Sequence, residues 1–212
     1  MKYSITLLAI SCATLLFSQT TKHYCAKRDA FSSNQVKSNS LSIAQIVETE
    51  RYDVHFYALD IEMNNLSTNV AGTGEIHGTA NVTLDSVLFE LFNSLTISQI
   101  RLNGIPTVFS RNNSAVKVPV NITAGQSFRI AIDYAGTPPN GVSNPLGGSG
   151  MTNASSPSWG NRVTWSLSES FAAYEWWPCK QSLKDKADSV SIKITVPNAC
   201  KAGSNGILEN VI

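Results

Sequence analysis

The sequence predicts a mainly β domain, an antiparallel β-sandwich or saddle-shaped sheet, and three observations lead to this prediction. Short runs in which apolar and polar residues alternate recur along the chain, as at Leu59 to Met63 and Phe128 to Tyr134. Turn-forming residues separate such runs about every ten positions. Asn103-Gly104, which follows one of these runs, is a strong signal for a tight hairpin turn.

The individual elements follow from the same patterns. Residues 41–50 predict a short helix with Ile43, Ile46 and Val47 on one face. A change of parity near Tyr57 and Ala58 predicts a bulge in the first strand. The segment from 136 to 161 is rich in Gly, Pro, Asn and Ser and predicts a long loop that is mobile or functional. Strands are expected in the regions 52–63, 72–84, 87–91, 95–102, 116–120, 128–134 and 190–196.

The N-terminus has the pattern of an export signal. Lys2 precedes an apolar run from Ile5 to Phe17 that is too short to span a bilayer. We therefore expect residues 1–18 to be a signal peptide, with cleavage after Ser18, and the mature protein to be periplasmic, at the cell surface or extracellular. Residues 19–49 predict a polar leader with the possible short helix, and no later segment is apolar enough for a transmembrane span.

Composition and charge exclude some classes of partner. Loss of residues 1–18 removes only Lys2, so the net charge falls from +1 to about zero. Without a basic stripe, the sequence argues against nucleic acid as a partner. After signal cleavage Cys25, Cys179 and Cys200 remain. Cys179 and Cys200 are able to form a disulfide in an exported protein, but the pairing of the three stays open.

The sequence offers no metal site. Its histidines, His23, His55 and His77, have no ligand spacing, and neither an H-E-x-x-H motif nor a C-x-x-C motif is present. We expect these histidines to be ordinary strand or loop residues. No residue of the chain is predicted to be catalytic.

A candidate site lies between Thr164 and Ala187. The adjacent tryptophans Trp176 and Trp177 are costly to expose and are expected to fill a packed corner before Pro178. Glu169 precedes this aromatic cluster. Its carboxylate is either an anchor for a cation such as a free amino terminus, or a partner in a salt bridge or turn cap.

The same stretch resembles the N-terminal domain of aminopeptidase N-like zinc metallopeptidases, peptidase family M1, in its exported bacterial form. The resemblance lies in a glutamate at Glu169, followed by Trp177-Pro178-Cys179 and Lys186-Ala187. A final strand and a Ser-Asn-Gly turn at Asn205-Gly206 complete it. It covers residues 50–212, although Lys180-Gln181-Ser182-Leu183 replaces the family's frequent Phe-Asp-Glu-Pro.

The resemblance implies a β domain that docks on a thermolysin-like catalytic domain. It implies that Glu169 binds the free α-amine of a peptide, with Trp176, Trp177, Pro178, Cys179, Asn205 and Gly206 as structural residues. Zinc and the general base are expected in the catalytic domain of the same parent protein, because their motifs are absent here. The chain is thus expected to be a truncated part of an exported zinc aminopeptidase, inactive alone. The alternative is a free-standing, non-catalytic β-sandwich module for adhesion or ligand binding at the cell surface.

Overall fold

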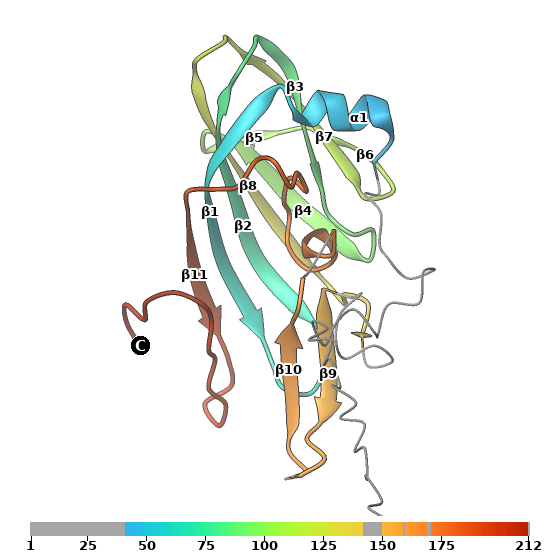
Figure 1. The fold of residues 1–212 in the computed structure, drawn as a ribbon, viewed down its shortest axis with the longest axis vertical. Helices are drawn as coiled ribbons and strands as arrows, with labels where there is room; N and C mark the ends of the chain where they lie inside the picture. The colour runs from blue at the N-terminus through green and yellow to red at the C-terminus, as the bar shows by residue number, and fades with distance from the viewer. Residues whose placement is uncertain (1–40, 142–149, 159, 169–170, 212) are drawn as a thin grey trace, which may run out of the picture.

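The computed structural model describes residues 41–141, 150–158, 160–168 and 171–211. Its elements are one short helix, one 3-10 turn and eleven strands (Figure 1). In chain order they are α1 (Ile43–Thr49), β1 (Tyr52–Met63), β2 (Val70–Ala80), β3 (Leu84–Glu90), β4 (Leu95–Leu102), β5 (Ile105–Thr107), β6 (Ser110–Asn112), β7 (Ala115–Ile122), β8 (Ser127–Gly136), β9 (Met151–Ser155), β10 (Arg162–Ser166), η2 (Ala173–Glu175) and β11 (Ser189–Thr195).

The predicted β class is confirmed, and the strands form three sheets. A six-stranded sheet has the order β11-β1-β2-β8-β4-β5, a three-stranded sheet the order β3-β7-β6, and β9 pairs with β10. One hydrophobic core joins the first two sheets, since Ile76 and Ile130 from one belong to the same buried cluster as Phe89 and Val116 from the other. All strand pairs are antiparallel except β1 with β11, which run parallel. The expectation of an antiparallel sheet therefore fails at this edge.

β1 shows how the alternating pattern builds the sandwich. Leu59 and Ile61 are buried, while Asp60 and Glu62 between and after them are exposed. The predicted bulge exists, but it lies between Val54 and Phe56 instead of at residues 57–58. The extra residue reverses the parity, so that even-numbered residues before it and odd-numbered residues after it face the same core.

The helix is present, but its predicted apolar face is only partly right. Ser42 caps α1 through a reciprocal pair of hydrogen bonds with Gln45. Ile46 packs against a small cluster that contains Leu41 and Leu88. Ile43 and Val47 are instead 83% and 62% exposed. A helix of two turns offers the sheet only a narrow contact, and β3 meets it on the side of Ile46.

The segment 136–161 is not simply a loop. β9 lies inside it and forms a hairpin with β10, which Figure 1 shows at the lower end of the molecule. An isolated two-stranded hairpin is only marginally stable in water. The buried amide of Asn153 ties the hairpin to the body, because its Nδ2 donates to the Asn65 carbonyl and to Thr164 Oγ1, both at 2.8 Å.

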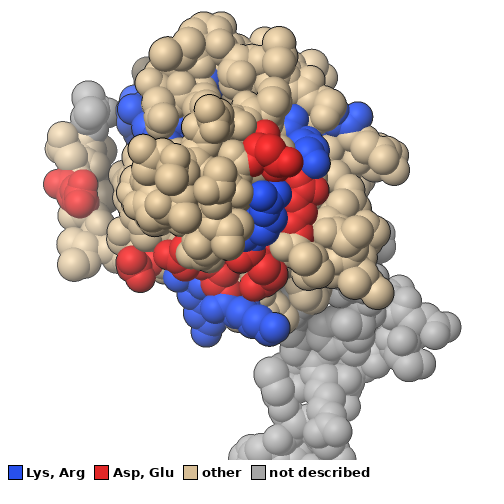
Figure 2. All heavy atoms as spheres, turned by 90° about the horizontal axis from the view of Figure 1, so that it is seen from above, with Lys and Arg blue, Asp and Glu red and all other residues tan. Residues whose placement is uncertain are grey.

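Charged side chains on the outer face of the six-stranded sheet are arranged as cross-strand ion pairs. Arg101 donates to both carboxylate oxygens of Asp133, and Arg129 contacts Glu75. The pKa of Asp133 is lowered, mainly because of the hydrogen bonds from Arg101. Acidic and basic side chains also intermix on the face seen in Figure 2. On both surfaces charged groups thus lie near groups of opposite sign, and no large region of one charge forms among their described residues.

Candidate functional site

The candidate site is the aromatic corner, residues 168 and 171–180, which leads from the end of β10 toward β11. Apart from the single 3-10 turn η2, the corner has no regular secondary structure. Pro178 lacks a backbone N–H and cannot continue a helix, and the next residue, Cys179, forms an isolated β-bridge with Glu90. The corner lies over the core, where Ala173, Tyr174 and both tryptophans pack against buried residues of the two main sheets.

Glu169, the predicted amine anchor, lies outside the described residues. The residues on either side of the pair 169–170 are held in the corner. Trp176 Nε1 donates a hydrogen bond to Ser168 Oγ at 2.8 Å, and Ala172 is completely buried. Phe171 has a φ of 61°, an unusual value for a bulky residue, which marks a sharp reversal of the chain just after the pair.

The two tryptophans are half-buried and are fixed by directed contacts. The Trp177 ring meets Tyr57 edge to face, with centroids 4.8 Å apart at 89°. The Trp176 ring lies next to it, at a centroid distance of 6.1 Å. Tyr134 OH donates to the carbonyl oxygen of Trp176 at 3.0 Å, and burial raises the pKa of this phenol. These contacts stabilise the two adjacent tryptophans, which would be costly to leave exposed to water.

Pro178 and Cys179 attach the corner to the sheets. The Pro178 ring lies directly above Gly74 of β2, where a Cβ would come within 2.6 Å of Pro178 Cγ. Cys179 forms a two-way backbone bridge with Glu90 at the end of β3, with N···O distances of 2.9 and 3.0 Å. Both residues of the bridge are buried. The corner is therefore seated on β2 and bonded to β3, that is, on both layers of the sandwich.

The cysteines described by the structure are free thiols. Cys179 is buried and Cys200 is partly exposed, so the disulfide considered for this pair does not form here. Burial raises the pKa of the Cys179 thiol, and the nearby Glu90 raises it further. Cys179 is thus an inert core residue under the tryptophans. Cys25 lies outside the described residues.

Glu175 is a buried carboxylate that the sequence patterns did not single out. Its side chain accepts a hydrogen bond from the Gly150 N–H at 2.5 Å, and the residue is only 2% exposed. A Cβ at Gly150 would lie 2.4 Å from the Ala172 carbonyl oxygen, so the chain before β9 passes very close to the corner. The contact joins the β9–β10 hairpin to η2. No local signal separates Glu175 from an exposed glutamate, because its partner lies 25 positions earlier in the chain.

The other predicted residues lie away from the packed corner. Asn205 and Gly206 belong to the exposed segment that follows β11, and Gly206 has a φ of 102°, as a turn glycine can adopt. His55 lies at the β1 bulge, and His77 Nε2 contacts Glu75 at 2.8 Å. Over the ranges that the structure describes, no group of three or more His, Cys, Asp or Glu side chains is placed to hold a metal ion. In the same ranges no helix has the length and hydrophobicity needed to cross a bilayer.

Comparison with known proteins identifies the fold. No protein-family model and no curated protein matches the sequence. Among solved structures, the chain is similar to the M1 zinc metallopeptidase from Deinococcus radiodurans, with a TM-score of 0.65, 22% identity, and coverage of 75% of this chain and 35% of that one. It is also similar to a mutant of that enzyme bound to a Tyr-Ser-Ala substrate, with a TM-score of 0.63, 23% identity, and coverage of 75% and 36%.

A more distant match is the leukotriene A4 hydrolase of yeast, with a TM-score of 0.58 and 14% identity. There the similarity covers 82% of this chain and 27% of the hydrolase. The chain thus has the fold of a part of the M1 zinc metallopeptidases, as the sequence resemblance predicts. It spans about a third of the length of the Deinococcus structures that it matches.

Proposed function

We propose that this chain is the substrate-anchoring N-terminal domain of an exported, zinc-dependent aminopeptidase that removes N-terminal residues from peptides. The observation that carries the proposal is the agreement between two independent features. The fold is similar to part of the M1 enzymes, and the described part of the Glu169 to Cys179 motif, residues 171–179, is packed on that fold. One of the matched enzymes binds a tripeptide.

Glu169 is the proposed anchor for the α-ammonium group. A carboxylate at the closed end of a cleft pairs with a free amino terminus by a charge-assisted hydrogen bond, which favours exopeptidase cleavage over internal cleavage. The nearest described residues with defined contacts lie in the aromatic corner, where Ser168 Oγ accepts a hydrogen bond from Trp176 Nε1 and Ala172 is buried. Fixed neighbouring residues lower the entropy cost of holding a carboxylate in one position.

The zinc site is proposed to lie in a catalytic domain elsewhere in the parent protein. The residues present do not fit a catalytic zinc, since the sequence lacks H-E-x-x-H and its three histidines are dispersed. Within the described ranges the structure groups no set of metal ligands. The chain by itself is therefore expected to bind peptides weakly and to hydrolyse none.

The first test is the size of the native protein, measured by immunoblotting of source cells and medium with an antibody to this domain. A band several times larger than the 22.9 kDa chain supports a parent with a further domain. A band at the size of this chain alone contradicts the proposal and favours a free-standing binding module.

The second test is the substitution Glu169→Ala in the native-length protein. We expect kcat/KM for unblocked aminoacyl substrates to fall by about 100-fold or more, because a charge-assisted bond to the ammonium is lost. Glu62→Ala, which removes an exposed glutamate of β1, is the matched control and leaves kcat/KM unchanged. Equal activity of the Glu169→Ala and control enzymes would refute the anchoring role.

A further inference from the structure

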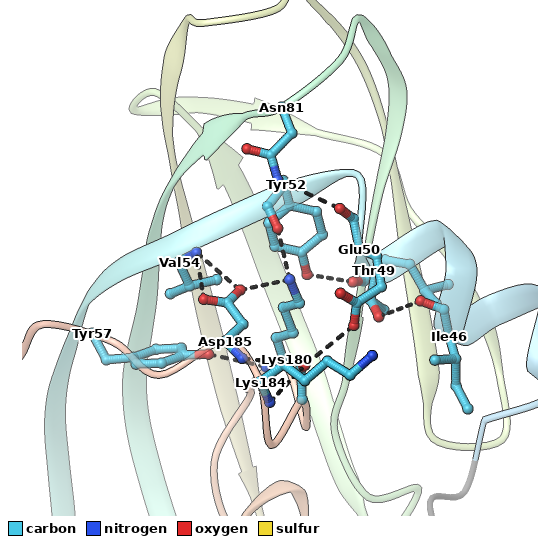
Figure 3. A network of polar contacts seen from close by, with 12 residues as sticks. Ile46, Thr49, Glu50, Tyr52, Val54, Tyr57, Asn81, Lys180, Lys184 and Asp185 are labelled. Atoms are coloured by element: carbon cyan, nitrogen blue, oxygen red, sulfur yellow. Dashed lines mark hydrogen bonds and ion pairs between the residues drawn. The ribbon is translucent and has the colours of Figure 1, made fainter.

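The segment from Lys180 to Asp188, which joins the aromatic corner to β11, contains a buried ion pair. The side chains of Lys180 and Asp185 are only 2% and 9% exposed, and Lys180 Nζ lies 2.5 Å from Asp185 Oδ2 (Figure 3). Lys180 Nζ also donates to the Tyr52 carbonyl oxygen at 2.6 Å and lies 4.6 Å from the centre of the Tyr52 ring. Its backbone N–H donates to Tyr57 OH at 3.1 Å. A lysine at this depth is rare unless it is fully paired.

The β1 bulge supplies the docking points for this segment. His55 is the residue that has no partner in the register between β1 and β2. Beside it, the Val54 N–H donates to the Asp185 carboxylate at 3.1 Å, and the His55 carbonyl accepts from the Asp188 N–H at 3.0 Å. The bulge thus frees backbone groups that a regular strand would pair with its neighbour. β11 begins at the next residue, Ser189, in parallel register with Phe56.

β11 is held more weakly than the strands in the middle of its sheet, although Ile192 and Ile194 pack, partly buried, against the main core. None of its seven residues is buried, whereas β8 in the middle of the same sheet contains five buried residues. Among the strands that the structure describes, β1 is the one neighbour of β11 in its sheet. Its one ion pair to the sheet, Lys193 with Asp60, has both side chains more than half exposed. Exposed pairs of this kind contribute little to stability.

We propose that the Lys180–Asp185 pair is a conformational lock that docks residues 180–195 on the bulged edge of β1. With the lock intact, β11 stays in the sheet. Without it, this segment opens as a unit while the two main sheets stay folded. Removing one partner leaves the other charge buried without its bonded counter-ion, which is strongly destabilising. Opening the segment relieves that cost by exposing mostly side chains that already touch water. This inference is independent of the proposed peptidase role.

Hydrogen exchange of backbone amides in the full chain tests the lock, with Lys180→Met and Asp185→Asn as the single variants. We expect exchange of the β11 amides to become at least roughly 100-fold faster in both, a conservative figure for a broken buried ion pair. Exchange at Ile130 and Ile132 of β8 is expected to stay within a few-fold of the wild type. Lys193→Met is the matched control, because it neutralises the exposed pair on the same strand, and it leaves β11 exchange nearly unchanged.

The double variant Lys180→Met/Asp185→Leu separates a lock from simple loss of stability. Since it leaves no buried charge unpaired, we expect it to recover much of the β11 protection that each single variant loses. Equal acceleration in β11 and β8, or no acceleration in either, would overturn the proposal. Global unfolding of both single variants would also overturn it, because the pair would then hold the whole domain. An effect of Lys193→Met as large as that of Lys180→Met would do the same.

Discussion

The contact between Gly74 and Pro178 predicts a specific cost for one added methyl group. In Gly74→Ala the new Cβ would lie 2.6 and 2.8 Å from Cγ and Cδ of the Pro178 ring, and 3.6 Å from Leu59 Cδ2. The proline ring is rigid and Cys179 next to it is bonded to β3, so the corner cannot move away freely. Overpacking of this kind costs about 1–3 kcal/mol. The lower entropy of alanine in the unfolded chain offsets only about 0.4–1 kcal/mol. We therefore expect a net loss of about 1–2 kcal/mol in the free energy of unfolding.

Equilibrium urea unfolding, followed by tryptophan fluorescence, measures this loss. Gly203→Ala is the matched control, since no atom lies within 4 Å of its added Cβ, and its effect should stay within about 0.5 kcal/mol. In a Pro178→Ala background the ring atoms are gone, and Gly74→Ala should then cost at least about 1 kcal/mol less than in the wild type. If Gly74→Ala is neutral, or if the two substitutions are additive, the corner is not seated on β2 as argued.

Two further predictions concern polar groups. Asn153→Ala removes the amide that holds the β9–β10 hairpin, so limited proteolysis should cut the hairpin faster, with a loss of about 1–3 kcal/mol of stability. Asn161→Ala, at an exposed position between the two strands, is the control and should leave the cleavage rate unchanged. The pKa of Asp133 is below its ordinary value because Arg101 donates to it, so its contribution to stability is present at neutral pH and is lost as pH falls through the folded-state pKa. Asp133→Asn should therefore flatten the decrease in unfolding free energy as pH falls below about 4, the ordinary pKa range of an aspartate, and identical slopes for both proteins would contradict this origin of the shift.

Several features of this protein could be predicted from the sequence because they depend on neighbouring residues alone. The alternation in β1, β7, β8 and β11 places these strands within a few residues of their observed bounds. Asn103 and Gly104 have φ values of 51° and 86°, as the predicted hairpin turn requires. The Glu169 to Cys179 spacing is also a local pattern, and it led to the fold that the solved structures share with this chain.

The tertiary structure alone decided the rest. β5 and β6 have three residues each and carry no periodicity that a sequence pattern can register. β9 lies in a segment rich in turn residues, and it is a strand because β10 pairs with it and because its own Asn153 side chain is bonded to Asn65. Lys180 and Asp185 have the composition of a solvated loop, yet they are buried because the β1 bulge presents free backbone groups to them. Whether a strand has a partner, and whether a charge is buried, depends on segments that are distant in sequence, so no local pattern contains that information.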